Sequence, residues 1–163
     1  MAVLIALPLS AVLALGTPVE VPDFSYAYRY QLQIETAATE ETLTEAVAAD
    51  LRRFFPFDSN CPVLPPVGAR CDLYTIPGLP LPGTTNPVQV VEKTKTSWTF
   101  RSLPGHIEGS DRNITFTFSR SKTALELRVH ASGPWTPTAA ATVHLGIAHA
   151  VWQVFADRVS AAY

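Results

Sequence analysis

Three tyrosines at alternate positions are the first residues of this sequence that could do chemistry. Tyr26, Tyr28 and Tyr30 belong to a run from Phe24 to Ile34 in which every second residue is apolar or aromatic, and this period predicts a half-buried strand. A buried tyrosine has a hydroxyl that needs a hydrogen-bond partner. Three of them in one row indicate a pocket lined by rings with a few donors. The alternative is a filled core with the hydroxyls at its rim.

Histidines are the next candidates, because imidazole titrates near neutral pH. His144 shares a stripe of the predicted terminal helix with the apolar residues that follow it, so we expect it to face the sheet. There it is either a hydrogen-bonded core histidine or an acid–base group of a pocket. His149 falls on the polar stripe and is predicted to be solvated. His106 and Glu108 lie in the segment PGHIEGSD, which is typical of a turn; a catalytic His–Glu pair is the alternative.

Several kinds of chemistry are excluded by missing motifs. The sequence has no GxSxG elbow, P-loop, GxGxxG, HExxH or paired-cysteine metal pattern, so we expect neither a metal nor a cofactor. Cofactor-free chemistry or plain binding remains. The two cysteines, Cys61 and Cys71, either form a disulfide, which would stabilise the fold by about 2–3 kcal/mol, or are two free thiols. Both interpretations fit the sequence equally well.

The composition is that of one globular domain with a core. The chain has 163 residues, 47% of them hydrophobic and 16% charged, with a net charge of −2. These values exclude a disordered chain. The lack of a basic surplus argues against a nucleic-acid partner. We therefore predict a single ligand-binding domain over residues 23–163, preceded by an apolar segment over residues 1–22.

The apolar N-terminal segment carries no charged side chain before Glu20. It lacks the basic start of a secretory signal and is interrupted by Pro8, and its charge-free run, residues 1–19, is shorter than the roughly 20 residues of a membrane span. We predict a retained segment that packs on the domain or on a partner subunit. This, with the low surface charge, favours a cytoplasmic homodimer and makes the membrane an unexpected partner. A cleaved signal, and with it secretion, is the alternative.

The elements that must position these residues follow one another in a simple order. After the tyrosine strand, Thr39 is the predicted N-cap of an amphipathic helix that Pro56 ends. Residues 59–87 are rich in proline, four strands follow at 88–92, 97–103, 113–120 and 124–131, and a helix covers 137–161. Consecutive strands with short links form an antiparallel sheet, and the last helix is the one element large enough to cover its apolar face. The prediction is an α+β fold, a curved antiparallel sheet wrapped around a long C-terminal helix.

One motif carries a resemblance to known proteins. The segment WTFRSLPGHIEG, residues 98–109, is similar to an F-x-x-x-LPGHPE-x-G run in an uncharacterised family of the helix-grip (SRPBCC) superfamily. That superfamily includes START lipid carriers, pathogenesis-related plant proteins and aromatic polyketide cyclases. Ile107 replaces the usual proline; the matching residues are Phe100, Leu103, Pro104, Gly105, His106 and Glu108. The resemblance implies a hydrophobic ligand held between the sheet and the terminal helix.

These observations lead to one prediction for the site. We expect a cavity with Tyr28 and His144 as catalytic residues, and with substrate-binding rings from Tyr26, Tyr30, Trp98, Phe100, Phe116 and Phe118. Residues 59–87 would form its mouth or lid. The predicted function is a cofactor-free cyclase or isomerase that acts on a hydrophobic, polyketide-like small molecule. A non-catalytic carrier of an apolar small molecule or lipid is the alternative.

Overall fold

The tyrosine strand is the first edge of a seven-stranded antiparallel sheet with the order β1-β7-β6-β5-β4-β3-β2. The structure is a computed structural model that describes residues 22–34, 37–75, 84–122 and 124–163. The apolar segment expected over residues 1–22 lies, except for Pro22, outside the described residues. The strands are β1 (Asp23–Gln31), β2 (Asp58–Ser59), β3 (Arg70–Tyr74), β4 (Thr85–Lys93), β5 (Ser97–Ser102), β6 (Asn113–Arg120) and β7 (Leu125–Pro134).

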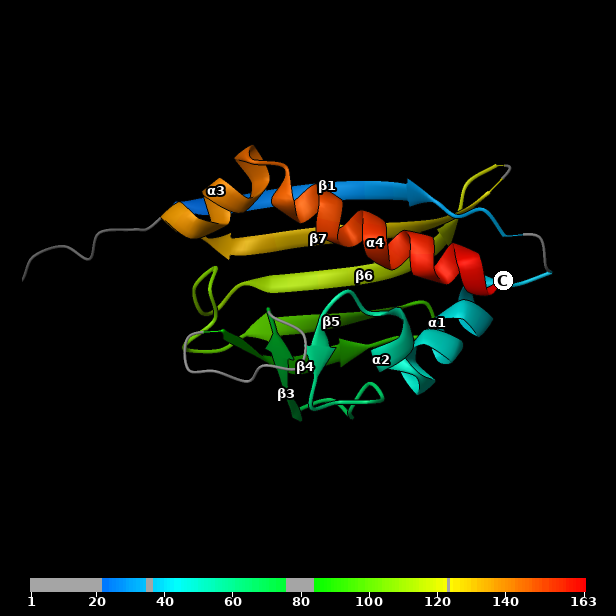
Figure 1. Ribbon diagram of the computed structural model, residues 1–163, viewed down its shortest axis with the longest axis horizontal. Helices are drawn as coiled ribbons and strands as arrows, with labels where there is room; N and C mark the ends of the chain where they lie inside the picture. Colours follow the sequence, from blue (N-terminus) through cyan, green and yellow to red (C-terminus); the bar gives the residue numbers. More distant parts are fainter. Residues whose placement is uncertain (1–21, 35–36, 76–83, 123) are drawn as a thin grey trace, which may run out of the picture.

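Helices cover one face of this sheet. Helix α4 (Ile147–Ala162) runs across the sheet, and α3 (Pro137–His144) lies at one end of it (Figure 1). Helices α1 (Glu40–Ala49) and α2 (Leu51–Phe54) lie beside the C-terminal half of α4 (Figure 1). The prediction of a curved antiparallel sheet with a helix in its grip is confirmed. Among the described residues no single helix is long and apolar enough to cross a membrane, and α3 and α4 reach that length only as a bent pair.

The register of the strands aligns their inward residues into rows across the sheet. One row joins Phe100, Ile114, Ala131 and Tyr26, because each pairs with the next on the neighbouring strand. A second row joins Trp98, Phe116, Val129 and Tyr28. A third continues from Phe118 through Leu127 to Tyr30. Alternate residues of a strand share a face, so the three tyrosines do belong to the inner side of the sheet, as the sequence predicts.

The helix after β1 begins where the sequence predicts and breaks earlier than predicted. Thr39 is the N-cap: its hydroxyl accepts from the backbone N–H of Thr42, whose hydroxyl accepts from the N–H of Thr39 in return. The helix is interrupted at Asp50 and ends at Phe54. Phe55 is extended, because a residue before proline is pushed out of the helical region. This turns the Phe55 ring into the core, where it is 2% exposed.

The terminal helix is two helices, which corrects the prediction of one continuous helix over 137–161. Leu145 and Gly146 separate α3 from α4, and the two axes differ by 64°. Gly146 has φ +72°, a left-handed conformation that glycine adopts without steric cost. The break has a consequence for His144, which ends α3 as an exposed residue. Its expected position facing the sheet is therefore wrong, since that expectation carried one helical stripe through the break.

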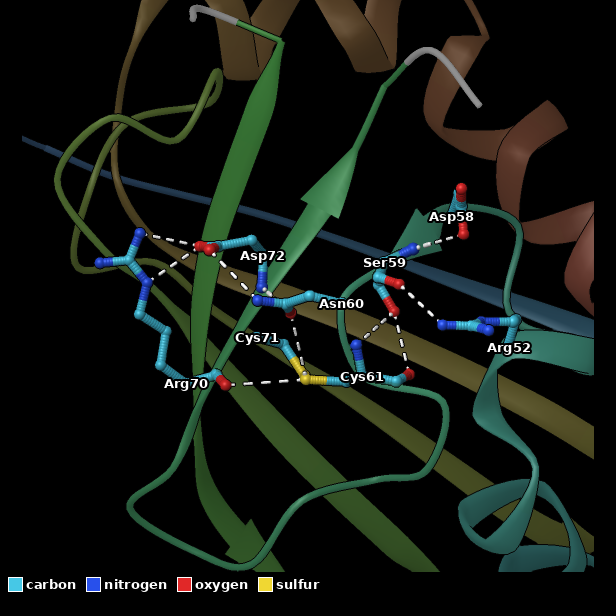
Figure 2. Close-up of a disulfide and its surroundings, with 8 residues drawn as sticks. All are labelled: Arg52, Asp58, Ser59, Asn60, Cys61, Arg70, Cys71 and Asp72. Atoms are coloured by element: carbon cyan, nitrogen blue, oxygen red, sulfur yellow. Dashed lines mark hydrogen bonds and ion pairs between the residues drawn. A yellow bond between two sulfur atoms is a disulfide. The ribbon is translucent and has the colours of Figure 1, made fainter. Parts of the chain in front are cut away.

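The two cysteines form a disulfide, so the first of the two alternatives holds. Cys61 follows β2 and Cys71 lies in β3, with their Cα atoms 5.8 Å apart (Figure 2). The side-chain oxygen of Asn60 accepts from the backbone N–H of Asp72 at 2.9 Å, which holds the same two segments together. Arg70 pairs with Asp72 on the exposed side, as Figure 2 shows. Part of the proline-rich stretch is thus an ordered strand pair; residues 76–83 of it lie outside the described residues.

We expect the loss of this disulfide to destabilise the domain without changing its fold. The bridge closes a loop of 10 residues, for which chain entropy gives about 2–3 kcal/mol. The double variant Cys61→Ala/Cys71→Ala should lose this amount in urea unfolding, and the wild-type protein should lose the same amount when it is reduced. Unchanged stability in both cases would contradict the prediction.

Candidate functional site

A cavity of about 320 Å³ lies between the sheet and α4, within the usual size range of small-molecule sites. Its sheet side is the row of Phe100, Ile114, Ala131 and Tyr26 together with Phe116. Opposite this row the cavity is lined by the following residues from the segment after α2 and from α4: Phe55, Phe57, Ile147, Ala148, Val151 and Trp152. Leu73 and Thr75, from the 59–87 stretch, also contribute to the wall; the predicted role of that stretch as a mouth or lid stays a prediction.

The predicted substrate-binding rings divide into two groups. Tyr26, Phe100 and Phe116 line the cavity. Trp98 and Phe118 are buried beside it, since both contact the ring of Phe155 from α4, with centroids 6.3 and 6.4 Å away. The third row of the sheet is thus covered by α4, and the second row is covered except at Phe116, which lines the cavity together with the first row. The alternation of apolar residues in the sequence predicted on which face of the sheet these rings lie. It could not predict which part of that face α4 covers.

Tyr28 and Tyr30 lie against His149 outside the cavity wall. The ring centroids of Tyr28 and His149 are 5.2 Å apart, and those of Tyr30 and His149 are 5.4 Å apart. The Tyr30 hydroxyl donates to the backbone oxygen of His149 at 2.9 Å. His149, expected to be solvated, is exposed and also packs on these two rings. Tyr28 and His144, the two residues predicted to be catalytic, therefore lie outside the cavity that the described residues form, and so does Tyr30, which was predicted to bind substrate.

The polar residues of the cavity gather around the loop between β5 and β6. Asn86 accepts from the backbone N–H of Ile107 at 2.9 Å, and the Ser102 hydroxyl donates to the oxygen of Gly109 at 2.7 Å. His106 and Glu108, from the same loop, also line the cavity. The turn predicted for PGHIEGSD is present, and both residues of the alternative His–Glu pair face the ligand space as well.

Glu108 is the carboxylate of this polar end. Its side chain is 17% exposed, and its Oε1 lies 2.7 Å from the hydroxyl of Thr142 on α3. Its Oε2 lies 3.9 Å from Nε of Arg112. Burial raises the pKa of Glu108, while the Thr142 hydroxyl and the Arg112 charge act in the opposite direction. A carboxyl with a raised pKa holds a proton more readily than an exposed glutamate does, which suits it to accept a proton from a bound ligand and to return it.

Arg112 fixes this end of the cavity. It is 4% exposed and donates to three backbone oxygens, those of Gly133, Pro134 and Phe24. These bonds connect the residue before β6 with the last residues of β7 and with the beginning of β1. Gly133 is required here, because a Cβ on it would lie 2.7 Å from the backbone of Arg112. The guanidinium therefore provides a positive charge next to Glu108 from a position that packing holds in place.

His106 is a neutral imidazole in this environment. Its Nδ1 accepts from the backbone N–H of Glu108 at 3.1 Å, so the neutral ring carries its proton on Nε2. Burial lowers the pKa of His106 to about 4, and the charge of Arg112 acts in the same direction. The ring thus offers a hydrogen-bond donor to the site at neutral pH.

Acid is expected to destabilise the fold through His106. Between pH 6.5, the ordinary pKa of histidine, and about pH 4, the unfolded chain takes up a proton that the folded chain does not. Stability is therefore lost as the pH falls through this window, by about 3 kcal/mol. The variant His106→Asn keeps an acceptor for the Glu108 N–H and should lack this loss in urea unfolding at several pH values. A His130→Asn control, at an exposed position, should keep it.

Tyr26 and Trp152 provide two further donors. Burial raises the pKa of Tyr26 above its ordinary value, and the neighbouring Glu108 charge adds to this, so the phenol stays protonated. The indole N–H of Trp152 faces this hydroxyl and opposes the shift of the pKa. Within the described part of the chain, however, Trp152 Nε1 is buried and completes no hydrogen bond. A buried donor without a partner is costly, and a ligand oxygen would satisfy it.

The sequence pattern pointed to some of these groups and missed others. The LPGHIEG motif indicated His106 and Glu108, although a turn was the preferred interpretation. Arg112, Thr142 and Trp152 were not predicted, because each becomes part of the site through contacts with residues distant in the chain. In the described ranges no group of three or more metal-binding side chains is present.

A curved antiparallel sheet that packs around a C-terminal helix is the helix-grip fold. Comparisons with protein families and with curated proteins found no match, so the finer resemblance to the LPGHPE family stays a prediction. Solved structures do share the fold. A norcoclaurine synthase point mutant of Thalictrum flavum, in complex with a transition-state analogue, has a TM-score of 0.62 at 13% identity, covering 88% of this chain and 96% of that one.

Two other similar structures come from bacteria. The Aha1 dimer of Colwellia psychrerythraea has a TM-score of 0.56 at 15% identity, covering 81% of this chain and 90% of that one. The protein MLL2253 of Mesorhizobium loti has a TM-score of 0.55 at 15% identity, covering 84% and 94%. At such low identity the likeness shows the fold alone.

Proposed function

We propose that this protein binds a hydrophobic, polyketide-like small molecule in its cavity and acts on it without a cofactor, as a cyclase or isomerase. The observation that carries the proposal is the division of the cavity into two parts. Most of the wall is aromatic or aliphatic, whereas the polar groups gather around the loop between β5 and β6. This arrangement favours a ligand with an apolar body and an oxygen function at one end.

Norcoclaurine synthase, which shares this fold, has also been solved in complex with dopamine and hydroxybenzaldehyde. Those are aromatic molecules with polar substituents. They support the choice of an aromatic ligand class for a helix-grip cavity that is lined by Phe100 and Phe116. In this proposal substrate folding within the cavity and hydrogen bonds at its polar end promote the reaction.

The first experiment asks whether the cavity binds an apolar ring system. Native mass spectrometry of freshly purified protein should reveal a retained small molecule. In addition, 2-ethylnaphthalene should bind in a fluorescence titration. The variant Ala148→Leu, whose side chain enters the cavity, should bind it about tenfold more weakly. The matched variant Ala150→Leu, on the exposed side of α4, should bind it like the wild type. If neither a retained ligand nor 2-ethylnaphthalene is bound, the proposal is wrong.

A carrier without catalysis is the second candidate, and the largely apolar wall favours it. A carrier needs only apolar contacts and a way in for the ligand. It predicts that a retained ligand leaves the protein chemically unchanged, and that the groups around Glu108 affect affinity alone. An enzyme predicts conversion of the ligand.

The Cys61–Cys71 disulfide favours an oxidising compartment, and thus secretion over the cytoplasmic location predicted first. Alkylation of unreduced protein in cell fractions, followed by mass spectrometry, tests this. The predicted homodimer is tested by sedimentation at high concentration, where a strict monomer would exclude it.

A further inference from the structure

The contact between Thr142 and Glu108 at the polar end of the cavity suits a carboxyl group that changes its protonation state. The Thr142 hydroxyl lies 2.7 Å from Oε1 of Glu108 and 2.9 Å from the backbone oxygen of Ala139. A hydroxyl has a single proton to donate. If Glu108 is a carboxylate, Thr142 donates to it. If Glu108 is a carboxylic acid, its O–H donates to the Thr142 oxygen, and Thr142 donates to Ala139.

Both protonation states of Glu108 are therefore hydrogen-bonded without any movement of the chain. The charged and titratable groups around it come from its own loop and from β1. Arg112 precedes β6, Tyr26 and Tyr28 come from β1, and His106 comes from the same loop as Glu108. Arg112 makes three bonds to backbone oxygens and lies 3.9 Å from Oε2, so it does not lock the carboxylate into a close ion pair.

A second feature is the pair of donors on the neighbouring wall. Trp152 Nε1 is buried and has no partner among the described residues, and the Tyr26 hydroxyl faces it. Both residues line the cavity. A ligand oxygen in the cavity that is within reach of both groups would accept a hydrogen bond from each. Donors arranged in this way in a water-poor site stabilise the negative charge that develops on a carbonyl oxygen.

We propose that the substrate is a ketone with an acidic C–H bond next to its carbonyl group, and that Glu108 moves the proton of that bond while Tyr26 and Trp152 hold the carbonyl oxygen. This rests on the proposed function, since it requires that the cavity bind an apolar molecule. The Glu108 carboxylate takes the proton from the carbon atom next to the carbonyl. The C–H electron pair becomes the C=C bond of an enolate, and the carbonyl π pair moves to the oxygen.

The second half of the reaction returns the proton. When a different carbon conjugated with the enolate takes the proton from the Glu108 carboxylic acid, the carboxylate is restored, the double bond has moved and an isomerisation is complete. Protonation of the original carbon returns the starting ketone with an exchanged proton. An enolate that instead attacks a second carbonyl carbon of the same molecule closes a ring, and Glu108 then gives its proton to the new alkoxide. No electrons are gained or lost overall, so the steps need no redox partner.

The test uses 2-acetylnaphthalene as the ketone and follows exchange of its methyl protons in D2O by NMR. Wild-type protein should accelerate the exchange above the rate in buffer. Glu108→Gln, which keeps the shape of the side chain, should lower the protein-dependent rate at least 100-fold and leave binding of the probe within threefold. Trp152→Phe should lower the rate about tenfold or more. Glu45→Gln, at an exposed site on α1, should have no effect.

Thr142 is a positioning residue in this scheme, and its test is a pH profile. Exchange should rise with pH, with an inflection above the range of an ordinary glutamate, about 4.3, because burial raises the pKa of Glu108. The Thr142 hydroxyl lowers that pKa, so Thr142→Val should move the inflection to higher pH. This profile also decides the question in the wild-type protein if Glu108→Gln fails to fold.

The outcomes separate this inference from the proposed function. Binding of 2-ethylnaphthalene and 2-acetylnaphthalene without accelerated exchange would overturn the role of Glu108 and leave the cavity as a carrier site. Exchange in Glu108→Gln within threefold of the wild type would overturn it as well. If the protein retains no ligand and binds neither probe, the proposed function is overturned, and this inference with it.

Discussion

Replacing Arg112 by methionine is expected to lower the free energy of unfolding by about 3–5 kcal/mol. The methionine has similar length, but it leaves the backbone oxygens of Phe24, Gly133 and Pro134 without their donor. It also removes the positive charge next to Glu108, whose side chain is only 17% exposed. The pKa of Glu108 should then rise further, because Arg112 holds it down in the wild type.

The control for this variant is another arginine of the same region. Arg101 pairs with Asp111 at 2.8 Å, but the two side chains are 49% and 61% exposed. An exposed pair contributes about 0–1 kcal/mol, so Arg101→Met should change the stability little. Urea unfolding of both variants at neutral pH measures the difference. Equal losses would show that burial of Arg112 has no special role.

Replacing Phe116 by alanine should cost about 3–5 kcal/mol and also change the ligand site. The ring is fully buried and packs on five aromatic rings, those of Phe55, Trp98, Phe100, Trp152 and Phe155. One side of it faces the cavity. The existing space lets some neighbours relax, which places the expected loss toward the lower end of this range. The enlarged cavity should bind ring systems larger than naphthalene.

Phe118 provides the matched variant that tests the effect of Phe116→Ala on the ligand site. It lies two residues further along β6, is 1% exposed and packs on Trp98 and Phe155 outside the cavity wall. Phe118→Ala should therefore cost a similar free energy and leave the size selectivity for ligands unchanged. Calorimetric unfolding and probe titrations on both variants separate the two effects. A change in selectivity for Phe118→Ala alone would contradict the assignment of the cavity.

Much of the fold could be predicted because its signals are local. The alternation from Phe24 to Ile34, the N-cap at Thr39 and the four strands after Pro87 each depend on residues that are close in sequence. A strand whose alternate residues are apolar must present that face to a core, so the inward tyrosines and phenylalanines followed directly. The terminal helix was predicted as an element, but its break was missed, since Gly146 differs from a tolerated helical glycine only by its φ of +72°.

The candidate site itself depends on contacts that no periodicity describes. Glu108, Thr142, Tyr26 and Trp152 come from a loop, α3, β1 and α4. They meet only because α4 covers most of the second and third rows of the sheet and leaves the first row open. The sequence by itself determined which face each residue takes, because strand and helix geometry follow from the local backbone. Only the tertiary structure decided which residues of that face remain free for a ligand, because this depends on the volumes and the crossing of elements far apart in the chain.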